Sequence, residues 1–383
     1  MTSTRSDGPS PSVAVPDRDA LDRLTAQVSP PDAAARAAAT ARQGQLTKPP
    51  GALGLLEDVS IQLAGIAATC PPPVPQRAAI AVFAADHGVH AQGVSPWPQE
   101  VTAQMVANFL GGGAAVTVLA REVGAEVVVV DVGVATPLLG VGAQPGPDDP
   151  AHLRRRRVRP GTADLSTAAA MTSAEALAAI EVGAQLADEL VSGGVTCLMT
   201  GDMGIANTTA SAALIAAFTG RDAAEVTGRG TGIDNATLDR KVDVVRRALA
   251  LHADAVAGGD PVAVLAAVGG LEHAAMVGFV LAAAARRVPV VLDGVIAGAA
   301  ALVVQALCPD ALGYCIAGHR SAEPGHTIAL AHLGLTPLVD LGLRLGEGTG
   351  AVLALPLVRA AARVLAEMAT FDSAGVTGKD ARA

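Results

Sequence analysis

The sequence predicts an α/β fold with a mostly parallel sheet that is covered by helices on both faces. Short apolar runs recur along the chain and alternate with longer stretches in which apolar residues follow helical spacing. The runs are continuously apolar, which is typical of strands buried on both faces. Glycine is abundant, with 42 residues among 383, and it often stands where an apolar run ends, as the tight turns of α/β units require.

Five apolar runs are predicted as strands, at 79–85, 127–132, 195–199, 289–292 and 313–317. The segment 337–341 reads as a further strand or a short helix, and 135–160 reads as a loop. Helices are predicted at 55–68, 98–110, 173–191, 210–218, 238–252, 270–286, 294–308 and 351–368, with one or two more within 19–43. Residues 1–18 are rich in Ser, Pro and Asp, which predicts a disordered extension, and the tail after Phe371 is expected to be loose.

Composition limits the classes of function. Hydrophobic residues make up 51% of the chain and aromatic residues only 2%, so the core must consist of Ala, Val, Leu and Ile. The net charge of −9 argues against nucleic acid as a partner, because phosphate backbones require a basic face. The single basic run, Arg154 to Arg157, is expected to be a solvated loop or a salt-bridged sheet edge.

Cysteine usage and segment lengths indicate a cytoplasmic protein. The four cysteines show no C-x-x-C spacing, which suggests neither a disulfide framework nor a zinc site. The N-terminus has no apolar core of the kind found in secretory signals. The longest uncharged apolar stretch, 294–308, has 15 residues and is shorter than the roughly 20 needed to span a bilayer, so we expect a buried core helix there.

Polar side chains gather where the predicted strands end: Asp86 and His87, Asp131, Asp202, Asp293, and His319 with Arg320. Ligands of open α/β sheets bind outside the carboxyl ends of the strands, so these positions predict a site. The alternative for His87 is a hydrogen-bonded turn residue without a role in the site.

The stretch from Thr200 to Lys241 contains two glycine-rich turns, and the second is Gly228 to Gly232. After a predicted strand, a turn that opens a helix directs backbone N–H groups towards an anion, and a nearby lysine would add a cation. The stretch therefore predicts a phosphate or nucleotide site, although tight turns that need positive φ would explain the glycines equally well. There is no P-loop motif. No G-x-G-x-x-G follows a strand, which disfavours a Rossmann dinucleotide fold.

Glu347 stands between two glycines, among apolar neighbours, just before the last long helix. Burial there would raise the pKa of its carboxyl group towards the range of a general base. The alternative is an ordinary carboxylate that interacts with the N-terminal end of a helix dipole.

Nine motifs resemble one enzyme family, and they occur in the order expected of it: Lys48-Pro-Pro-Gly-Ala-Leu-Gly-Leu-Leu-Glu57, Ala85-Asp-His-Gly-Val89, Gly93-Val-Ser-Pro-Trp-Pro-Gln-Glu-Val-Thr102, Asp131-Val-Gly-Val134, Gly201-Asp-Met-Gly-Ile-Ala-Asn-Thr-Thr209, Gly228-Arg-Gly-Thr-Gly232, Leu292-Asp-Gly294, Gly318-His-Arg-Ser321 and Gly346-Glu-Gly-Thr-Gly350. Between Asp19 and Val376 the chain resembles the nicotinate-nucleotide–dimethylbenzimidazole phosphoribosyltransferases of cobalamin lower-ligand assembly.

The resemblance implies a reaction and an architecture. Nicotinate mononucleotide and 5,6-dimethylbenzimidazole would give α-ribazole 5′-phosphate and nicotinate, with inversion at C1′ and without a metal or other cofactor. The family pattern implies a homodimer. It also implies a large α/β domain, 76–350, that carries the active site, and a small helical domain built from 19–75 and about 351–376.

The resemblance also assigns roles to residues. Glu347 matches the general base. The residues expected to bind the phosphoribosyl group are Asp202, Gly204, Ile205, Asn207, Thr208, Gly230 and Lys241. The residues expected to line the acceptor pocket are Ser95, Gln104 and Leu345, and the further candidates at strand ends are Asp86, His87 and Asp293. No metal ligand is implied.

The chain departs from the family pattern at three positions. Asp202 stands where glutamate is usual, Ala206 where glycine is usual, and Asp164 where asparagine is expected. Ala206 must therefore adopt negative φ or tolerate strain. Two alternatives stay open: transfer to another acceptor, such as phenol, cresol, another benzimidazole or a purine, and a nucleotide-binding relative without activity. Trp97 and Tyr314 are the only Trp and Tyr, which limits aromatic stacking on an acceptor.

Overall fold

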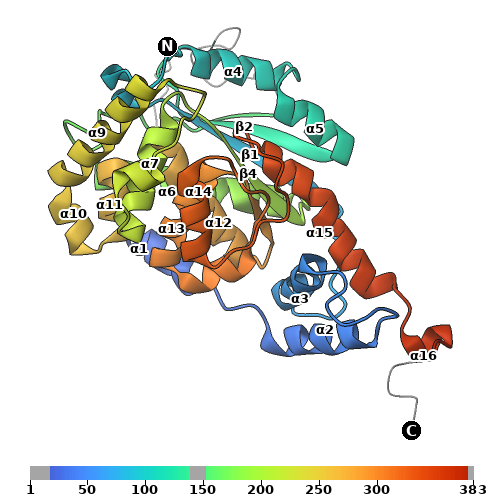
Figure 1. Cartoon of the computed structure of the whole chain (residues 1–383). Coiled ribbons are helices and arrows are strands. Elements are labelled where there is room, and N and C mark those ends of the chain that lie inside the picture. Colours follow the sequence, from blue (N-terminus) through green and yellow to red (C-terminus); the bar gives the residue numbers. More distant parts are fainter. Residues whose placement is uncertain (1–17, 139–151, 378–383) are drawn as a thin grey trace, which may run out of the picture.

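The computed structural model describes residues 18–138 and 152–377 (Figure 1). The predicted disordered extension lies outside these residues except for Arg18, which begins helix α1. Within the described ranges the chain forms one six-stranded sheet surrounded by helices, which confirms the predicted fold class.

The sheet is parallel throughout. Its strands are β1 (Ala78–Ala85), β2 (Ala125–Gly133), β3 (Leu153–Arg155), β4 (Cys197–Met203), β5 (Val290–Leu292) and β6 (Cys315–Ala317). They lie in the order β3-β2-β1-β4-β5-β6. The chain moves outward in one direction from β1 and in the other from β4, so the topological switch point lies between these two strands.

This strand order is that of a doubly wound Rossmann sheet. The expectation that such a fold is disfavoured was therefore wrong for the topology. It rested on the missing G-x-G-x-x-G motif, which reports how a backbone approaches a pyrophosphate and does not report the order of strands.

Alternate residues of β1 point into two separate cores. Ala79, Ala81 and Phe83 join the larger core, while Ile80 and Val82 join the other. Because every one of these side chains is buried, the strand is apolar along its whole length. Phe83 makes an edge-on contact with Phe279, with ring centroids 5.4 Å apart.

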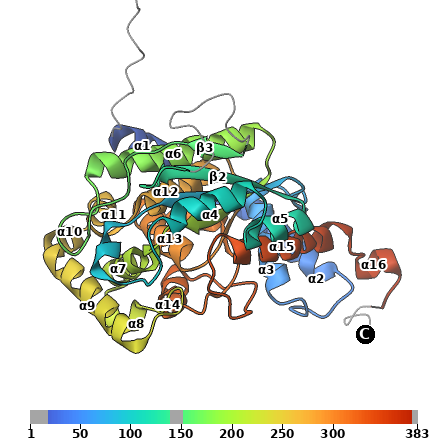
Figure 2. The same ribbon diagram turned by 90° about the horizontal axis from the view of Figure 1, so that it is seen from above.

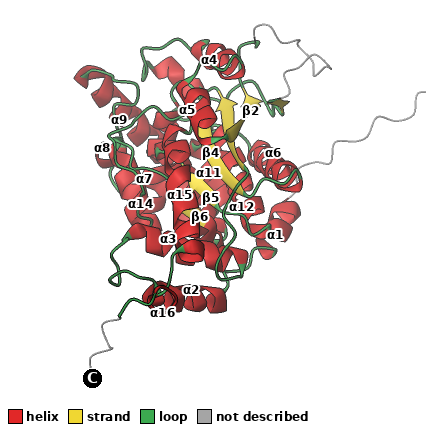
Figure 3. Cartoon of the chain, turned by 90° about the vertical axis from the view of Figure 1, so that its right-hand side faces the viewer, coloured by secondary structure: helices red, strands yellow, loops and turns green. Residues whose placement is uncertain are grey.

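Helices cover both faces of the sheet (Figure 3). The larger core includes α6 (Ser173–Ser192), α7 (Asn207–Thr219), α11 (Pro261–Val268), α12 (Leu271–Ala285) and α13 (Val295–Leu307). The other core includes α3 (Leu55–Ala67), α4 (Val101–Leu110), α5 (Ala115–Val123) and α15 (Thr349–Glu367). The remaining helices are α1 (Arg18–Ala26), α2 (Ala33–Gln45), α8 (Ala223–Val226), α9 (Asn235–Leu251), α10 (Ala253–Gly258), α14 (Pro324–Leu333) and α16 (Phe371–Ala374), with 3-10 turns at Gly88–Gln92 and Pro309–Tyr314.

Helices from the early and the late part of the described chain meet in one group. Helices α2, α3, α16 and the end of α15 gather at one side of the molecule (Figure 1). Arg42 of α2 donates to the carbonyl of Ala366 in α15 at 3.0 Å, and Leu46 pairs with Thr370. Helix α1 packs instead on α6 and α12, as the view from above shows (Figure 2). We propose that the first group is the small domain and that the sheet with its helices is the large one.

The structure corrects three local expectations. The short edge strand β3 lies within the stretch that was predicted to be a loop, of which residues 139–151 lie outside the described part. The segment 337–341 forms neither a strand nor a helix, but a single bridge between Val339 and His319. The tail after Phe371 begins with the short helix α16.

The basic run forms the salt-bridged edge that was one of its two predicted forms. Arg154 pairs with Glu189 at 2.6 Å, and Arg157 pairs with Asp131 at 2.9 Å.

Two segments are long and apolar enough in composition to cross a membrane, Val101–Val123 and Thr349–Glu367. The first consists of two helices, α4 and α5, that are separated by a turn, and the second, α15, packs on α3, α5, β4 and β5. Both segments therefore serve as core helices of this fold.

Candidate active site

Two adjoining cavities open at the carboxyl ends of β1, β4 and β5. The polar cavity includes Ser95, Lys241, Ser321 and Glu323 in its lining, and the apolar cavity includes Trp97, Val101, Met105 and Glu347. Both share a common wall formed by Asp202, Gly204, Ile205, Asn207, Thr231, Arg344 and Leu345. One ligand in each cavity would therefore meet its neighbour at this wall.

Lys241 supplies a cation to the polar cavity. It lies in α9, is 2% exposed, and donates from Nζ to Thr208 Oγ1 at 2.7 Å and to the carbonyl of Gly228 at 3.2 Å. Burial lowers the pKa of its ammonium group to about 8. The two glycine-rich turns of the sequence thus converge on one buried ammonium group.

The first turn leads directly from β4 into α7. Ala206, the N-cap residue, adopts φ +77°, so it occupies the left-handed region that favours glycine, and of the two expected outcomes it shows the strained one. In the described part of the chain, no backbone or side-chain acceptor meets the N–H groups of Ala206 and Thr208. Unpaired N–H groups at the start of a helix are a ready anion site.

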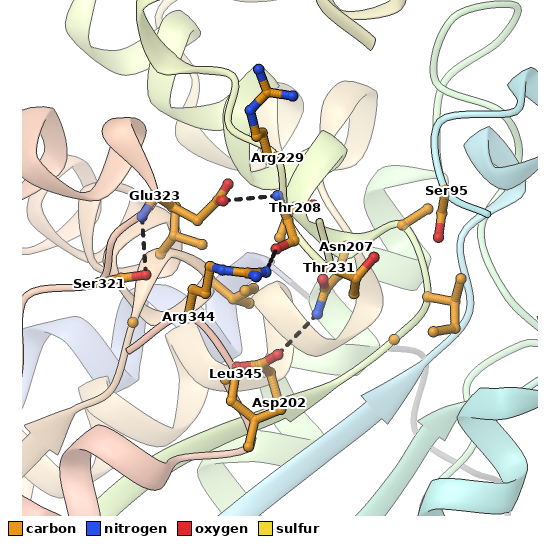
Figure 4. A pocket seen from close by; sticks show the side chains of 18 of the residues that line it. Ser95, Asp202, Asn207, Thr208, Arg229, Thr231, Ser321, Glu323, Arg344 and Leu345 are labelled. Carbon is orange, nitrogen blue, oxygen red and sulfur yellow. Dashed lines mark hydrogen bonds between the residues drawn. The ribbon is translucent and has the colours of Figure 1, made fainter. Parts of the chain in front are cut away.

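Asp202 is part of the wall that the two cavities share. Its Oδ2 accepts a hydrogen bond of 2.9 Å from Asn207 Nδ2, which Figure 4 shows, while Oδ1 has no partner in the described chain. Burial, together with the nearby charge of Asp293, raises the pKa of this carboxyl group well above its usual range. A carboxyl group that is buried with one free oxygen is suited to a polar ligand group, such as a sugar hydroxyl.

Glu347 lies on a strained loop that is pressed against the sheet. Its own φ is +64° and it is 6% exposed, with Oε2 accepting a long hydrogen bond of 3.4 Å from the N–H of Val116. A Cβ at Gly201 would come 2.4 Å from the carbonyl of Glu347, and one at Gly348 would come 2.0 Å from Ile80 Cδ1. Only glycine fits at either place, so the glycines allow this close approach. Burial raises the pKa of the Glu347 carboxyl group, as the sequence predicted for a general base.

Asp293 fastens this loop to the end of β5. Its Oδ2 accepts from the N–H of Gly348 at 3.1 Å, and its Oδ1 accepts from those of Gly350 and Ala351 at 2.8 and 3.1 Å. His319 Nε2 lies 3.6 Å from Oδ1. The residue that was predicted as a strand-end candidate therefore caps α15 and holds the backbone next to Glu347.

Two charged lining residues that form hydrogen bonds with Gly230 were not recognised from the sequence. Glu323 is buried, and its Oε1 accepts from the N–H of Gly230 at 2.8 Å. Arg344, labelled in Figure 4, donates to the carbonyl of Gly230 at 2.9 Å and lines both cavities. A carboxylate directly before Pro324 at a helix start, and an arginine three positions before Glu347, were the signals that could have identified them.

The other predicted residues lie at different distances from the cavities. Ser95 lines the polar cavity, and Leu345, 56% exposed, lies at the mouth of both. Gln104 is exposed on α4 and lines neither cavity; Val101 and Met105 of the same helix line the apolar one. Asp86 and His87 are buried behind the site, where Asp86 Oδ2 accepts from the N–H of Ala135 at 2.7 Å.

The described residues contain no group of three or more His, Cys, Asp or Glu side chains that could hold a metal ion. Instead, the arrangement combines a cationic, N–H-rich cavity with an apolar cavity that has one buried carboxylate in its wall. It can hold an anionic group next to an apolar group, and it can accept a proton from the apolar one.

Known proteins share this fold and sequence. A family model described as phosphoribosyltransferase matches residues 28–376. The chain is 60% identical over 364 residues to the nicotinate-nucleotide–dimethylbenzimidazole phosphoribosyltransferase of Salinispora tropica, covering 94% of this chain and all of the relative (100%). It is 54% identical over 361 residues to the protein of that name from Roseiflexus sp., covering 94% of this chain and 98% of the relative.

A crystal structure of the enzyme of the same name from Thermus thermophilus superimposes with a TM-score of 0.83 at 48% identity, covering 91% of this chain and 99% of that one. Family match, relatives and structure all extend over nearly the full length of each protein. The chain is therefore a phosphoribosyltransferase enzyme, and it belongs to the family of the nicotinate-nucleotide–dimethylbenzimidazole phosphoribosyltransferases.

Proposed function

We propose that this enzyme transfers the 5-phosphoribosyl group from nicotinate mononucleotide to 5,6-dimethylbenzimidazole, with inversion at C1′, and releases α-ribazole 5′-phosphate and nicotinate. The observation that carries this proposal is the common wall. Asp202 faces both the polar cavity, which contains Lys241, and the apolar cavity, which contains Glu347. C1′ of the ribose would lie at this wall, between the leaving ring and the incoming ring.

The phosphoribosyl group would occupy the polar cavity. Its phosphate would bind Lys241 and Thr208 together with the free N–H groups at the start of α7. Asp202, held by Asn207, would meet the ribose. Because Asp is one methylene shorter than the usual glutamate, a ribose contact requires a shifted backbone or a bridging water.

The chemical step would need one proton acceptor. The bond between C1′ and the nicotinate ring nitrogen breaks with its electron pair going to that nitrogen, which neutralises the cationic ring. One benzimidazole nitrogen attacks C1′ from the opposite face, and the other nitrogen loses its proton to the carboxylate of Glu347. Positive charge that develops on the ribose would be stabilised by the free carboxyl oxygen of Asp202, and the two cavities would hold the reactants in contact.

The direct test is incubation of the purified protein with nicotinate mononucleotide and dimethylbenzimidazole, followed by chromatography of nicotinate and α-ribazole 5′-phosphate. Both products should appear in equal amounts. Parallel reactions with phenol, p-cresol, other benzimidazoles and adenine would show which acceptor is preferred. The absence of nicotinate release with every acceptor would favour the alternative of a binding protein without activity.

Location and assembly are part of this proposal. We expect a cytoplasmic homodimer, which is consistent with the full-length match to a family of enzymes. Light scattering after size exclusion at several protein concentrations would measure the oligomeric state, and a mass of 37.9 kDa would indicate a monomer.

A further inference from the structure

A network of buried polar side chains, formed by His87, Glu272, His273 and Ser211, lies behind the Gly204 turn. Glu272, in the first turn of α12, has no exposed side-chain surface, and its Oε1 lies 2.7 Å from His87 Nε2 and 2.9 Å from His273 Nδ1. The two imidazole rings are nearly perpendicular, with an interplanar angle of 83° and centroids 6.2 Å apart. One carboxylate oxygen is thus shared by two histidines, one from the end of β1 and one from α12.

The network continues into α7. His273 Nε2 lies 2.8 Å from Ser211 Oγ, and the Ser211 hydroxyl donates to the carbonyl of Asn207 at 3.0 Å. Ser211 Oγ and His273 Nε2 share one hydrogen bond, and its donor depends on the tautomer of the imidazole ring. Asn207 in turn donates to Asp202. Contacts therefore connect Glu272 to the wall of the active site without a break.

The two imidazole rings stabilise the negative charge of Glu272. Burial alone would raise the pKa of Glu272, but the two histidines outweigh it and the pKa is lowered. The contacts with both rings make the complete burial of this carboxylate tolerable.

His87 also supports the turn directly. A Cβ at Gly204 would lie 3.4 Å from the His87 ring and 2.3 Å from the carbonyl of Ala85, so the turn rests on both. Buried ion pairs add little stability compared with apolar packing of the same volume. None of the four residues lines either cavity, and none has a role in the transfer step.

We propose that His87, Glu272, His273 and Ser211 are positioning residues that fix the first turn of α7, and with it Asn207 and Asp202, against the bound nucleotide. This inference rests on the proposed function. Its distinctive consequence is a difference in degree. Loss of the network affects the nucleotide cavity, which also contains Ala206 and Thr208 of the same turn, more than the acceptor cavity, which shares with it only the common wall.

The sharpest test compares two hydroxyl deletions in α7. Ser211→Ala removes the link to His273. Thr219→Ala is the matched control, because Thr219 Oγ1 donates to the carbonyl four residues earlier, that of Ile215, in the same way and at 2.6 Å. Ser211→Ala should raise the KM for nicotinate mononucleotide by about fivefold or more, since one buried hydrogen bond is lost, and should leave the KM for dimethylbenzimidazole within about twofold. Thr219→Ala should change neither KM.

Glu272→Gln is the second variant, which keeps the side-chain shape and removes the shared negative charge. It should produce the same selective rise in the nucleotide KM, and calorimetry should show a matching loss of nucleotide affinity. Equal changes in both KM values, no change in either, or failure of both variants to fold would overturn the proposal, since each outcome indicates a purely structural role. A wild-type protein that releases no nicotinate would instead contradict the proposed function.

Discussion

The carboxylate of Asp293 holds the backbone beside Glu347. Three N–H groups within four residues of Glu347, those of Gly348, Gly350 and Ala351, donate to this one side chain. The loop needs such an anchor because φ is positive at Gly346, Glu347 and Gly348 in succession. The strain of the loop and the position of the candidate base are therefore maintained from another strand.

Asp293→Ala should lower both stability and kcat. The substitution leaves three buried N–H groups without their charged acceptor, and hydrogen bonds to charged groups contribute roughly 1.5–3 kcal/mol each before relaxation. We expect a loss of about 3 kcal/mol in the free energy of unfolding, measured with urea, and a fall in kcat that exceeds any change in the KM for the nucleotide. Wild-type kcat in a folded Asp293→Ala protein would show that the anchor does not position Glu347.

Ala206→Gly should stabilise the protein. A non-glycine residue in the left-handed region costs about 1–2 kcal/mol, whereas the extra freedom of glycine in the unfolded chain offsets about 0.4–1 kcal/mol of the gain. A net increase of about 0.5–1 kcal/mol in the free energy of unfolding follows. The control is Ala217→Gly within the same helix, which should destabilise by about 1 kcal/mol. A loss of stability in both variants would contradict the strain at φ +77°.

The strand ends illustrate how much could be predicted from the sequence. Apolar runs located the main strands, and the polar residues after them, such as Asp202 and Asp293, do gather at one edge of the sheet because parallel strands share a direction. What Asp293 does there could not be predicted, since its partners lie more than fifty positions later, on a loop whose path depends on tertiary packing. Likewise, the rotation of α4 about its axis, which directs Gln104 outward, depends on its neighbours.

Short elements were the least predictable. β3 has three residues and is paired only with β2, so its polar arginines give no apolar run to detect. The roles of Arg344 and Glu323 could not be predicted, because each residue contacts Gly230 from a distant part of the chain. Long-range contacts of this kind leave no periodic pattern in the sequence.

Lys241→Ala should raise the KM for nicotinate mononucleotide much more than the KM for dimethylbenzimidazole. The ammonium group lies in the polar cavity beside Thr208, and loss of a charge-assisted bond to phosphate should cost about tenfold or more in KM. Steady-state kinetics with each substrate varied in turn will measure both constants. An equal effect on both would count against a phosphate role.

The same lysine predicts a pH dependence. Burial lowers its pKa to about 8, so the ammonium group loses its proton as the pH rises through that value. The KM for the nucleotide should therefore be constant below this pH and rise above it, by up to about tenfold per unit once the neutral form predominates. A KM that stays constant up to pH 9.5 would mean that the charge of Lys241 is not used.

Glu347 predicts an acid limit. Burial raises the pKa of its carboxyl group, and only the ionised form can accept a proton. As the pH falls through this raised pKa, kcat should decline, with a midpoint above the ordinary range of a glutamate. The pH profile of kcat at saturating substrates measures the midpoint; a decline confined to the range of an exposed glutamate would contradict a buried base.

The most direct test of the account is the Glu347→Gln variant. Glutamine keeps the length of the side chain and its packing on the loop but cannot accept the benzimidazole proton. We predict that kcat falls by about 10²–10⁴-fold, the usual contribution of a general base. Calorimetry should show that nicotinate mononucleotide still binds with wild-type affinity, because its cavity is unchanged. A variant that turns over near the wild-type rate would contradict the role of Glu347 and, with it, the central claim.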